Sequence, residues 1–262
     1  MHTATYYIDL LLSGITVGSL YALIAIGYTM VYGILRLINF AHGDIFMMSG
    51  FFMIYVSATL PMAVSIPVVL LMTVLLGVLI ERAAYKPLRS APRMSVMISA
   101  IGVSYLLQNL ATYITGGLAR PYPEISFLKK SFAIGSLNIK IITLLTPVLT
   151  ILLVIALVIF IKHTKTGMAM RAVSKDFDTA RLMGIKVNSV ITVTFIIGSF
   201  LAGVGSIPGA VLGAYIIGVC ESLIKANDSI AIFSNAFTFA LLIVVLLFKP
   251  NGMFGEKLTE KV

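Results

Sequence analysis

Between two long apolar runs the chain reads Arg36-Leu37-Ile38-Asn39-Phe40-Ala41-His42-Gly43-Asp44, a short stretch that carries amide, imidazole and carboxylate groups. Residues 10–32 before it and residues 45–72 after it contain no Asp, Glu, Lys or Arg. Uncharged runs of this length are typical of membrane-spanning helices. A polar group in hydrocarbon needs an internal partner, so such residues usually face a bundle interior or a water-filled path. The pattern therefore predicts a protein that moves something across a membrane.

Two roles are open for the polar members of this stretch. Asn39, His42, Gly43 and Asp44 are candidates for a translocation path. Alternatively, their side chains satisfy carbonyl groups where the helix breaks at Gly43, since irregular backbone in a membrane is tolerated only with internal partners. The structural role is the favoured interpretation, because the functional rule for intramembrane polar groups is only a default.

Composition sets the fold class. The chain is 59% hydrophobic and 11% charged, with a mean hydropathy of +1.05, whereas a soluble domain is about 45–50% apolar and about 25% charged. Lipid must cover much of this excess, and the runs lack the alternation of barrel strands. We therefore expect an all-α fold, a polytopic transmembrane helical bundle that forms one transmembrane domain over residues 1–262.

The net charge of +9 does not indicate nucleic acid, because the basic residues lie in loops between the apolar runs. That distribution is the one membrane orientation requires. Cys220, the single cysteine, lies in an apolar run and is expected to act as a small hydrophobe. No Lys or Arg precedes Arg36, so the basic region of a cleavable signal peptide is missing and the first span is expected to remain as an anchor.

The apolar runs predict about seven to eight spans, some of them broken, since a span needs roughly 20 residues. The candidates are 9–34, 38–60, 62–81, 94–115, 140–161, 190–224 and 230–248. The most basic loops, 81–93 and 162–189, are assigned to the cytoplasm by the positive-inside rule. The N-terminus and residues 116–139 are then outside.

Residues 190–224 are too long for one span and too short for two, and they contain six glycines. Gly205, Gly209 and Gly213 repeat at every fourth position, which places small residues on one helix face and permits close helix packing. Gly14 and Gly18 repeat this spacing in the first span. Glu221, near the end of the same apolar run, is expected to reach an interface beside Lys225.

The loop 162–189 is the most polar segment and predicts a short helix over about 175–183. Ser174 is the expected N-cap, Asp176 and Asp178 follow in the first turn, and Gly184 suits the position after the helix end. Phe177, Ala180 and Arg181 share one face at helical spacing. Such a helix can lie on lipid or dock into a partner's groove, and the alternative is a solvated connector.

Several motifs give the chain a resemblance to a known family. Asp178-Thr179-Ala180-x-x-x-Gly184 resembles the Glu-Ala-Ala-x-x-x-Gly signature of ABC importer permeases. Together with residues 38–44, 119–123, 167–173 and 205–210, it makes the chain similar to LivH-type permeases of branched-chain amino acid importers. The resemblance implies contact with partner ATPases through Arg171, Asp176, Phe177, Asp178, Ala180, Arg181 and Gly184.

One departure from the family pattern falls between Val204 and Gly205. Family members carry an additional segment there, on the order of 20 residues or more, which is enough for much of another span. We therefore expect a natural or engineered deletion, or a segment absent from this sequence, and a gap or an abrupt break in the chain at this junction.

The resemblance also implies the function and the partners. The chain has no Gly-x-x-x-x-Gly-Lys-[Ser/Thr] loop to hold nucleotide phosphates, so we expect no enzymatic activity and no cofactor of its own, with ATP used by partner subunits. The expected partners are a second homologous permease, two ATPases, an extracytoplasmic binding protein and membrane lipid, with no nucleic acid. The expected location is the bacterial cytoplasmic (inner) membrane.

The substrates would be leucine, isoleucine and valine. Urea or short-chain amides remain an alternative, because related permeases share the Asn-x-Ala-His-Gly type of motif. A secondary transporter with Asp44, His42 or Glu221 as proton relay is a further alternative, but that mechanism does not require a capped cytosolic helix.

Overall fold

The computed structural model describes residues 2–35, 39–89, 91–118, 121, 131–134, 137–202, 208–225, 231–234, 236–237 and 240. Nearly all of this part is helical. The long helices are α1 (His2–Leu35), α2 (His42–Ser57), α3 (Met62–Ile80), α4 (Arg93–Thr115), α5 (Ile141–His163), α8 (Val187–Ala202) and α9 (Pro208–Lys225). The short ones are η1 (Glu81–Tyr85), η2 (Lys86–Leu88), α6 (Lys165–Lys175), α7 (Phe177–Leu182) and η3 (Ala231–Phe233).

The polytopic helical fold is confirmed. Four helical stretches among the described residues are long and apolar enough to cross a membrane, namely Tyr6–Leu35, Met62–Leu88, Met94–Thr115 and Ile141–His163. On α3, Leu71, Leu75 and Leu79 recur at every fourth position and are each more than half exposed, as expected of a face that meets lipid. The expected span 230–248 lies mostly outside the described residues, so the total of seven to eight spans stays a prediction.

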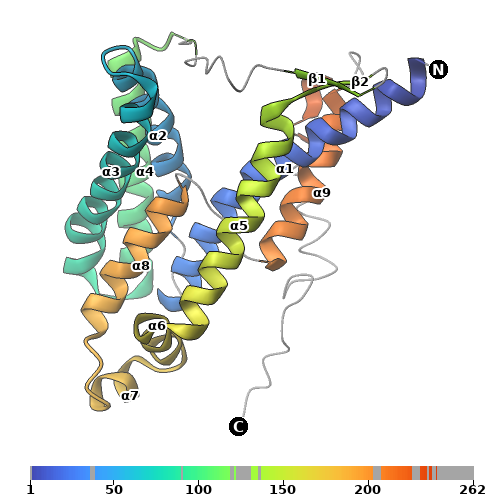
Figure 1. Cartoon of the computed structure of the whole chain (residues 1–262). Coiled ribbons are helices and arrows are strands. Elements are labelled where there is room, and N and C mark those ends of the chain that lie inside the picture. Colours follow the sequence, from blue (N-terminus) through green and yellow to red (C-terminus); the bar gives the residue numbers. More distant parts are fainter. Residues whose placement is uncertain are drawn as a thin grey trace.

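Helix α1 is the element around which the others are arranged. In Figure 1 it runs obliquely through the molecule, with α2, α3, α4 and α8 on one side, α9 on the other, and α5 crossing in front of it. It packs against α9, α8 and α5. The buried core includes Ile26 and Val31 of α1, Ile45 of α2 and Phe195 of α8. Helices α6 and α7 lie at the end of the molecule opposite the hairpin, which agrees with the predicted cytoplasmic and outer sides (Figure 1).

A two-stranded hairpin is a feature of the fold that the apolar pattern did not predict. Strands β1 (Ser131–Ile134) and β2 (Leu137–Lys140) pair antiparallel, with Ser131 opposite Lys140. β2 continues directly into α5. The hairpin falls in a segment that was assigned only as an outer connection, and its few short strands do not alter the helical fold class.

The end of the third span is irregular because of a proline. Glu81–Tyr85 form a π-helical turn and Lys86–Leu88 a 3₁₀ turn. Pro87 has no N–H, so the regular ladder of backbone hydrogen bonds cannot continue through it. Instead, the Lys86 N–H bonds the Glu81 carbonyl, and Ser99 of α4 donates its hydroxyl to the Ala84 carbonyl at 3.2 Å.

The region 190–224 contains parts of two helices, since α8 ends at Ala202 and α9 begins at Pro208. The expected break or gap between Val204 and Gly205 lies outside the described residues, as does Gly205 itself. Gly209 and Gly213 lie in α9, and their packing falls outside the described part of the structure.

Gly14 and Gly18 of α1 lie against α9, where Gly218 is their neighbour. A Cβ atom on Gly218 would lie 2.4 Å from the Gly18 nitrogen and 2.7 Å from the Gly14 carbonyl oxygen. Real Cβ atoms do not approach backbone so closely, so glycine is required at Gly218. This contact is the small-residue packing of membrane helices.

Candidate functional site

The polar stretch that opens the second span is buried in the bundle. Asn39 and His42 are almost fully buried, and Asp44 is buried as well, whereas Gly43 is exposed. The expected break at Gly43 is wrong: α2 begins at His42, and the irregular backbone lies before it, at Asn39–Ala41. Gly43 sits in the first helical turn, where it contacts no other side chain closely.

Asn39 connects this turn to the third span. Its Oδ1 accepts a hydrogen bond from the Ala41 N–H at 3.1 Å and another from the Tyr85 hydroxyl at 2.7 Å. Tyr85 belongs to the π-helical turn and packs its ring against Phe195 of α8. The Asn39 side chain therefore closes the turn before α2 and attaches it to η1.

His42 connects the same turn to α1. Its Nε2 lies 3.2 Å from the carbonyl oxygen of Ile24, and because a carbonyl only accepts, Nε2 carries the proton. The ring lies so close to α1 that a Cβ on Gly27 would approach Nε2 within 2.5 Å. Gly27 is thus part of the histidine site, although no sequence pattern indicated this role.

Asp44 is held by α4. Gln108 donates its Nε2 to Asp44 Oδ1 at 3.0 Å, and the carboxylate also lies in the first turn of α2, where the helix dipole stabilises negative charge. Asp44 Oδ2 and Asn39 Nδ2 are buried and have no partner among the described residues. The hydrogen bonds give Asn39 and His42 the structural role that was favoured. A place in a translocation path stays a prediction.

A buried ion pair near the predicted cytoplasmic side was missed by the sequence interpretation. Glu81 is completely buried at the end of α3 and pairs with Arg89. Thr192 of α8 donates to its second carboxylate oxygen at 3.2 Å, and Arg89 also bonds Asn188. Glu81 is the only acidic residue between positions 45 and 123. An isolated acidic residue at the end of an apolar run was the available indication of a buried ion pair. Glu81 instead falls within the basic loop 81–93 of the sequence-based topology.

The segment 162–189 is more helical than predicted. It contains the end of α5 and all of α6 and α7. Thr164 caps α6, because its hydroxyl accepts from the Gly167 N–H at 3.0 Å. Gly167 lies against the last turn of α5, where a Cβ would come within 2.5 Å of backbone atoms of Phe160 and Ile161.

Ser174 is not the N-cap that the sequence predicted. It lies within α6, and its hydroxyl donates to the Arg171 carbonyl at 2.9 Å. Asp176 is the N-cap of α7, since its Oδ1 accepts from the N–H groups of Asp178 and Thr179 at 2.8 and 3.1 Å. A second helix therefore starts immediately after the first, at the acidic residue that had been placed inside its first turn.

The end of α7 agrees with the prediction. Gly184 has a φ of +81°, its N–H bonds the Arg181 carbonyl, and the Ile185 N–H bonds the Ala180 carbonyl, both at 3.0 Å. This is a Schellman ending, in which glycine is favoured because of its positive φ. The side chain of Leu182 is 87% exposed, and Met183 after it is also exposed.

The predicted face of α7 is divided between the interior and the solvent. Ala180 is buried and Phe177 is partly buried against the core, whereas Arg181 is exposed and lies 3.8 Å from Asp178. Arg171 is exposed on α6, and its Nη2 donates to the Lys162 carbonyl at 3.3 Å. A cavity of about 310 Å³ lies beside the contact between α7 and the membrane helices, and its lining includes Arg89, Phe177, Asp178 and Arg181.

Comparison with known proteins assigns the family. Residues 10–206 match the family described as "Branched-chain amino acid transport system / permease component". The chain is 35% identical to the high-affinity branched-chain amino acid transport permease protein LivH of Salmonella typhimurium over 304 positions, which cover 98% of each chain. This chain belongs to that family.

Other relatives support the same family assignment. The permease BraD of Pseudomonas aeruginosa is 35% identical over 304 positions, and LivH of Escherichia coli K12 is 35% identical over 306, again with 98% of each chain covered. No solved structure matches the chain. The protein is therefore a permease component of a transport system, and its apolar helices and family place it in the cytoplasmic membrane.

The lengths of these alignments differ from the length of the chain. The Salmonella alignment runs over 304 positions, whereas 98% of the 262-residue chain is about 257 residues, so about 47 positions of the relative have no counterpart here. The match to the family stops at residue 206.

Proposed function

We propose that this chain is the permease subunit of an ABC importer that moves leucine, isoleucine and valine into the cell. It works with a second homologous permease, two ATPases and an extracytoplasmic binding protein. The permease uses no cofactor of its own and catalyses no reaction, because the partner ATPases hydrolyse ATP. The family and the names of the relatives support the substrate class.

The observation that carries the proposal is the structure of α7. A six-residue helix capped by Asp176 and ended by Gly184 is defined at both ends, although it is too short to be stable alone. It presents Leu182 and Met183 to solvent, and exposed apolar side chains next to charged ones are typical of a partner surface. We infer that α7 docks into an ATPase groove, with Arg171, Asp176, Phe177, Asp178, Ala180, Arg181 and Gly184 forming or supporting the contact.

Movement of α7 would reach the bundle through the residues around its cavity. Arg89 lines that cavity and also pairs with Glu81, and Glu81 begins the π-helical turn that ends at Tyr85. Tyr85 in turn bonds Asn39. This chain of contacts offers a route from the ATPase to the polar turn before α2, as a rigid-body switch between inward-open and outward-open states requires.

Uptake into proteoliposomes tests the proposal. The permease pair, with ATPases, ATP and binding protein, should accumulate radiolabelled leucine, and omission of the ATPases or of ATP should abolish uptake. Flux through this chain alone, without ATP, would support the secondary transporter instead. Uptake of urea or acetamide in place of leucine would assign the substrate to the amide-transporting relatives.

We also propose that a segment of the natural permease is absent between Val204 and Gly205. The surplus of about 47 aligned positions supports a missing segment, and the end of the family match at residue 206 supports its location. A segment of that size is enough for one span and its loop, since a span needs roughly 20 residues. The intact mass of the protein purified from its native membrane tests this, because the 262-residue chain weighs 28.2 kDa and a longer chain would weigh more.

A further inference from the structure

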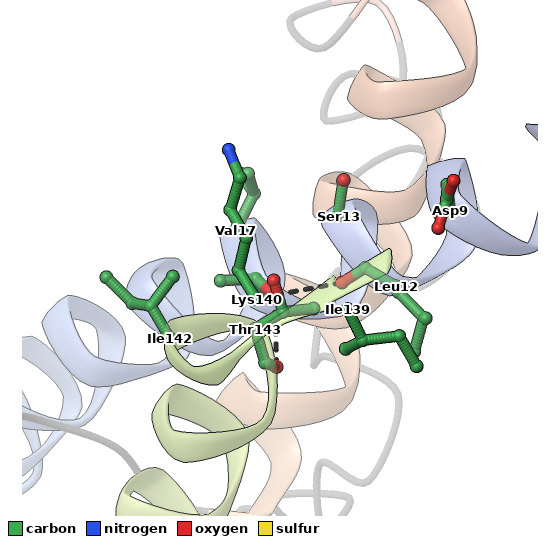
Figure 2. Close-up of a pocket in the computed structure, with 9 residues that line it drawn as sticks. Asp9, Leu12, Ser13, Val17, Ile139, Lys140, Ile142 and Thr143 are labelled. Atoms are coloured by element: carbon green, nitrogen blue, oxygen red, sulfur yellow. Dashed lines mark hydrogen bonds between the residues drawn. The ribbon is translucent and has the colours of Figure 1, made fainter. Parts of the chain in front are cut away.

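A cavity of about 420 Å³ lies at the end of the molecule that carries the hairpin, between α1, β2 and the start of α5 (Figure 2). Its volume falls in the range of about 300–1,000 Å³ that is usual for small-molecule sites. Because α6 and α7 lie at the opposite end of the molecule, this cavity is on the predicted outer side (Figure 1). None of the residues that line it belongs to the polar stretch 36–44 or to the segment 162–189.

Two opposite charges line this cavity. Asp9 comes from α1, and Lys140 is the last residue of β2. Both are exposed, and none of the ion pairs between described residues joins them. Figure 2 shows the Lys140 ammonium and the Asp9 carboxylate on either side of the Ser13 hydroxyl. The cavity therefore offers separate contacts to a cation and to an anion.

The position of Lys140 is not explained by the helix that it precedes. Lys140 is the N-cap residue of α5, and its side chain makes no capping hydrogen bond. A cation is disfavoured at this end of a helix, where the dipole is positive, whereas an anion is stabilised there. A bound anion would thus remove an unfavourable arrangement that the chain alone retains.

A hydroxyl group of α1 lies at the wall of the cavity next to α5. Thr16 Oγ1 lies 2.9 Å from the Leu12 carbonyl oxygen and 3.3 Å from the Thr143 carbonyl oxygen. The Thr143 carbonyl has no helical partner because residue 147, four positions later, is Pro147. The Thr16 hydroxyl has one proton, and when that proton points to the Thr143 carbonyl it links α1 to α5 beside the cavity.

We propose that this cavity is an outer binding site for a free aliphatic α-amino acid. The α-ammonium group contacts Asp9, the α-carboxylate contacts Lys140, and the side chain lies against Leu12, Val17 and Ile142. The choice of an amino acid over other zwitterions rests on the proposed function. In this position the site receives substrate on the outer side before it enters the bundle.

Ligand-observed NMR on the complete transporter in nanodiscs, without binding protein, tests the site. Three probes separate its halves: leucine, leucinamide, which lacks the carboxylate, and isocaproate, which lacks the ammonium. Asp9→Asn should weaken leucine and leucinamide binding about tenfold, as expected for a lost charged contact, and leave isocaproate unchanged. Lys140→Gln should weaken the binding of leucine and of isocaproate and leave the binding of leucinamide unchanged. Lys162→Gln, the same change at the other end of α5, should have no effect.

Both side chains are exposed, so neither substitution removes a buried partner. The exchange Asp9→Lys with Lys140→Asp should restore leucine binding, because a zwitterion can bind in the reverse direction. Leucine binding that is unchanged in all of these variants would contradict the proposed site. So would binding that occurs in phosphatidylglycerol nanodiscs and disappears when phosphatidylethanolamine is added, which would assign the cavity to a lipid headgroup. ATP-driven leucine uptake by the same preparation reports the proposed function separately.

Discussion

Gly218 of α9 lies directly against Gly18 of α1, with no room for a Cβ atom on Gly218 between the two backbones. Gly218→Ala should therefore separate the helices and destabilise the protein by about 1–3 kcal/mol, the usual cost of overpacking. Gly33→Ala is the matched control, because Gly33 lies in α1 with nothing close to its Cβ position. It should be neutral or slightly stabilising, since alanine is the better helix former. Thermal unfolding in detergent distinguishes the two, and equal melting temperatures would contradict the packing.

Arg89 neutralises Glu81 inside the bundle. Arg89→Leu should leave a buried, unpaired carboxylate and cost about 3–5 kcal/mol of stability. Glu81→Leu combined with Arg89→Leu should recover most of that loss, because no charge then remains unpaired. Denaturation of the single and double variants measures the coupling between the two residues. A double variant as unstable as Arg89→Leu would show that the unpaired Glu81 carboxylate is not the cause of the lost stability.

The Tyr85 hydroxyl supports the turn before α2 through Asn39. Tyr85→Phe should cost about 1–3 kcal/mol, because Asn39 loses a buried hydrogen-bond donor. Tyr105→Phe is the control, since Tyr105 is exposed on α4. If the turn also transmits movement from the ATPases, Tyr85→Phe should lower uptake more than its loss of folded protein explains, which uptake per assembled transporter would report.

Gly184 ends α7 with a left-handed backbone conformation. Asn and Asp side chains have nearly the same shape, and both residues tolerate this backbone conformation. Gly184→Asn is therefore a matched control for Gly184→Asp. We expect Gly184→Asn to keep most ATP-driven uptake and Gly184→Asp to lose it, because the added negative charge lies at the negative end of the helix dipole and at the proposed docking surface. Co-purification with the ATPases would show whether assembly persists. Normal uptake by Gly184→Asp would count against docking of this helix end.

The orientation in the membrane can be read by labelling. In a Cys220→Ser background, Lys175→Cys should react with a membrane-impermeant maleimide only from the cytoplasmic side. Phe132→Cys, on the exposed face of the hairpin, should react only from outside. The opposite pattern of labelling would reverse the topology.

Much of the fold followed from local features of the sequence. The long uncharged runs predicted the bounds of α3, α4 and α5 closely, and the end of α1 but not its start, because crossing a bilayer requires a minimum length of apolar helix. Gly184 and the acidic start of α7 were also predicted, since caps depend on groups only a few residues apart. The N-cap was placed at Ser174 instead of Asp176, because both residues have side chains that can cap a helix.

What the sequence by itself determined is a membrane helical permease with basic loops and a short capped helix between residues 162 and 189, because each of these features depends on near neighbours in the chain. Only the tertiary structure decided which residues lie together: Glu81 beside Thr192, Gly27 beside His42, and the Tyr21 hydroxyl on Glu221. It also places Asp9 and Lys140 around one cavity, with no ion pair between them. These residues lie far apart in sequence and follow no helical period, so nothing local specifies them. They come together because the helices pack according to the shapes of their surfaces. A glycine contact or an ion pair between helices forms only where two helix surfaces touch.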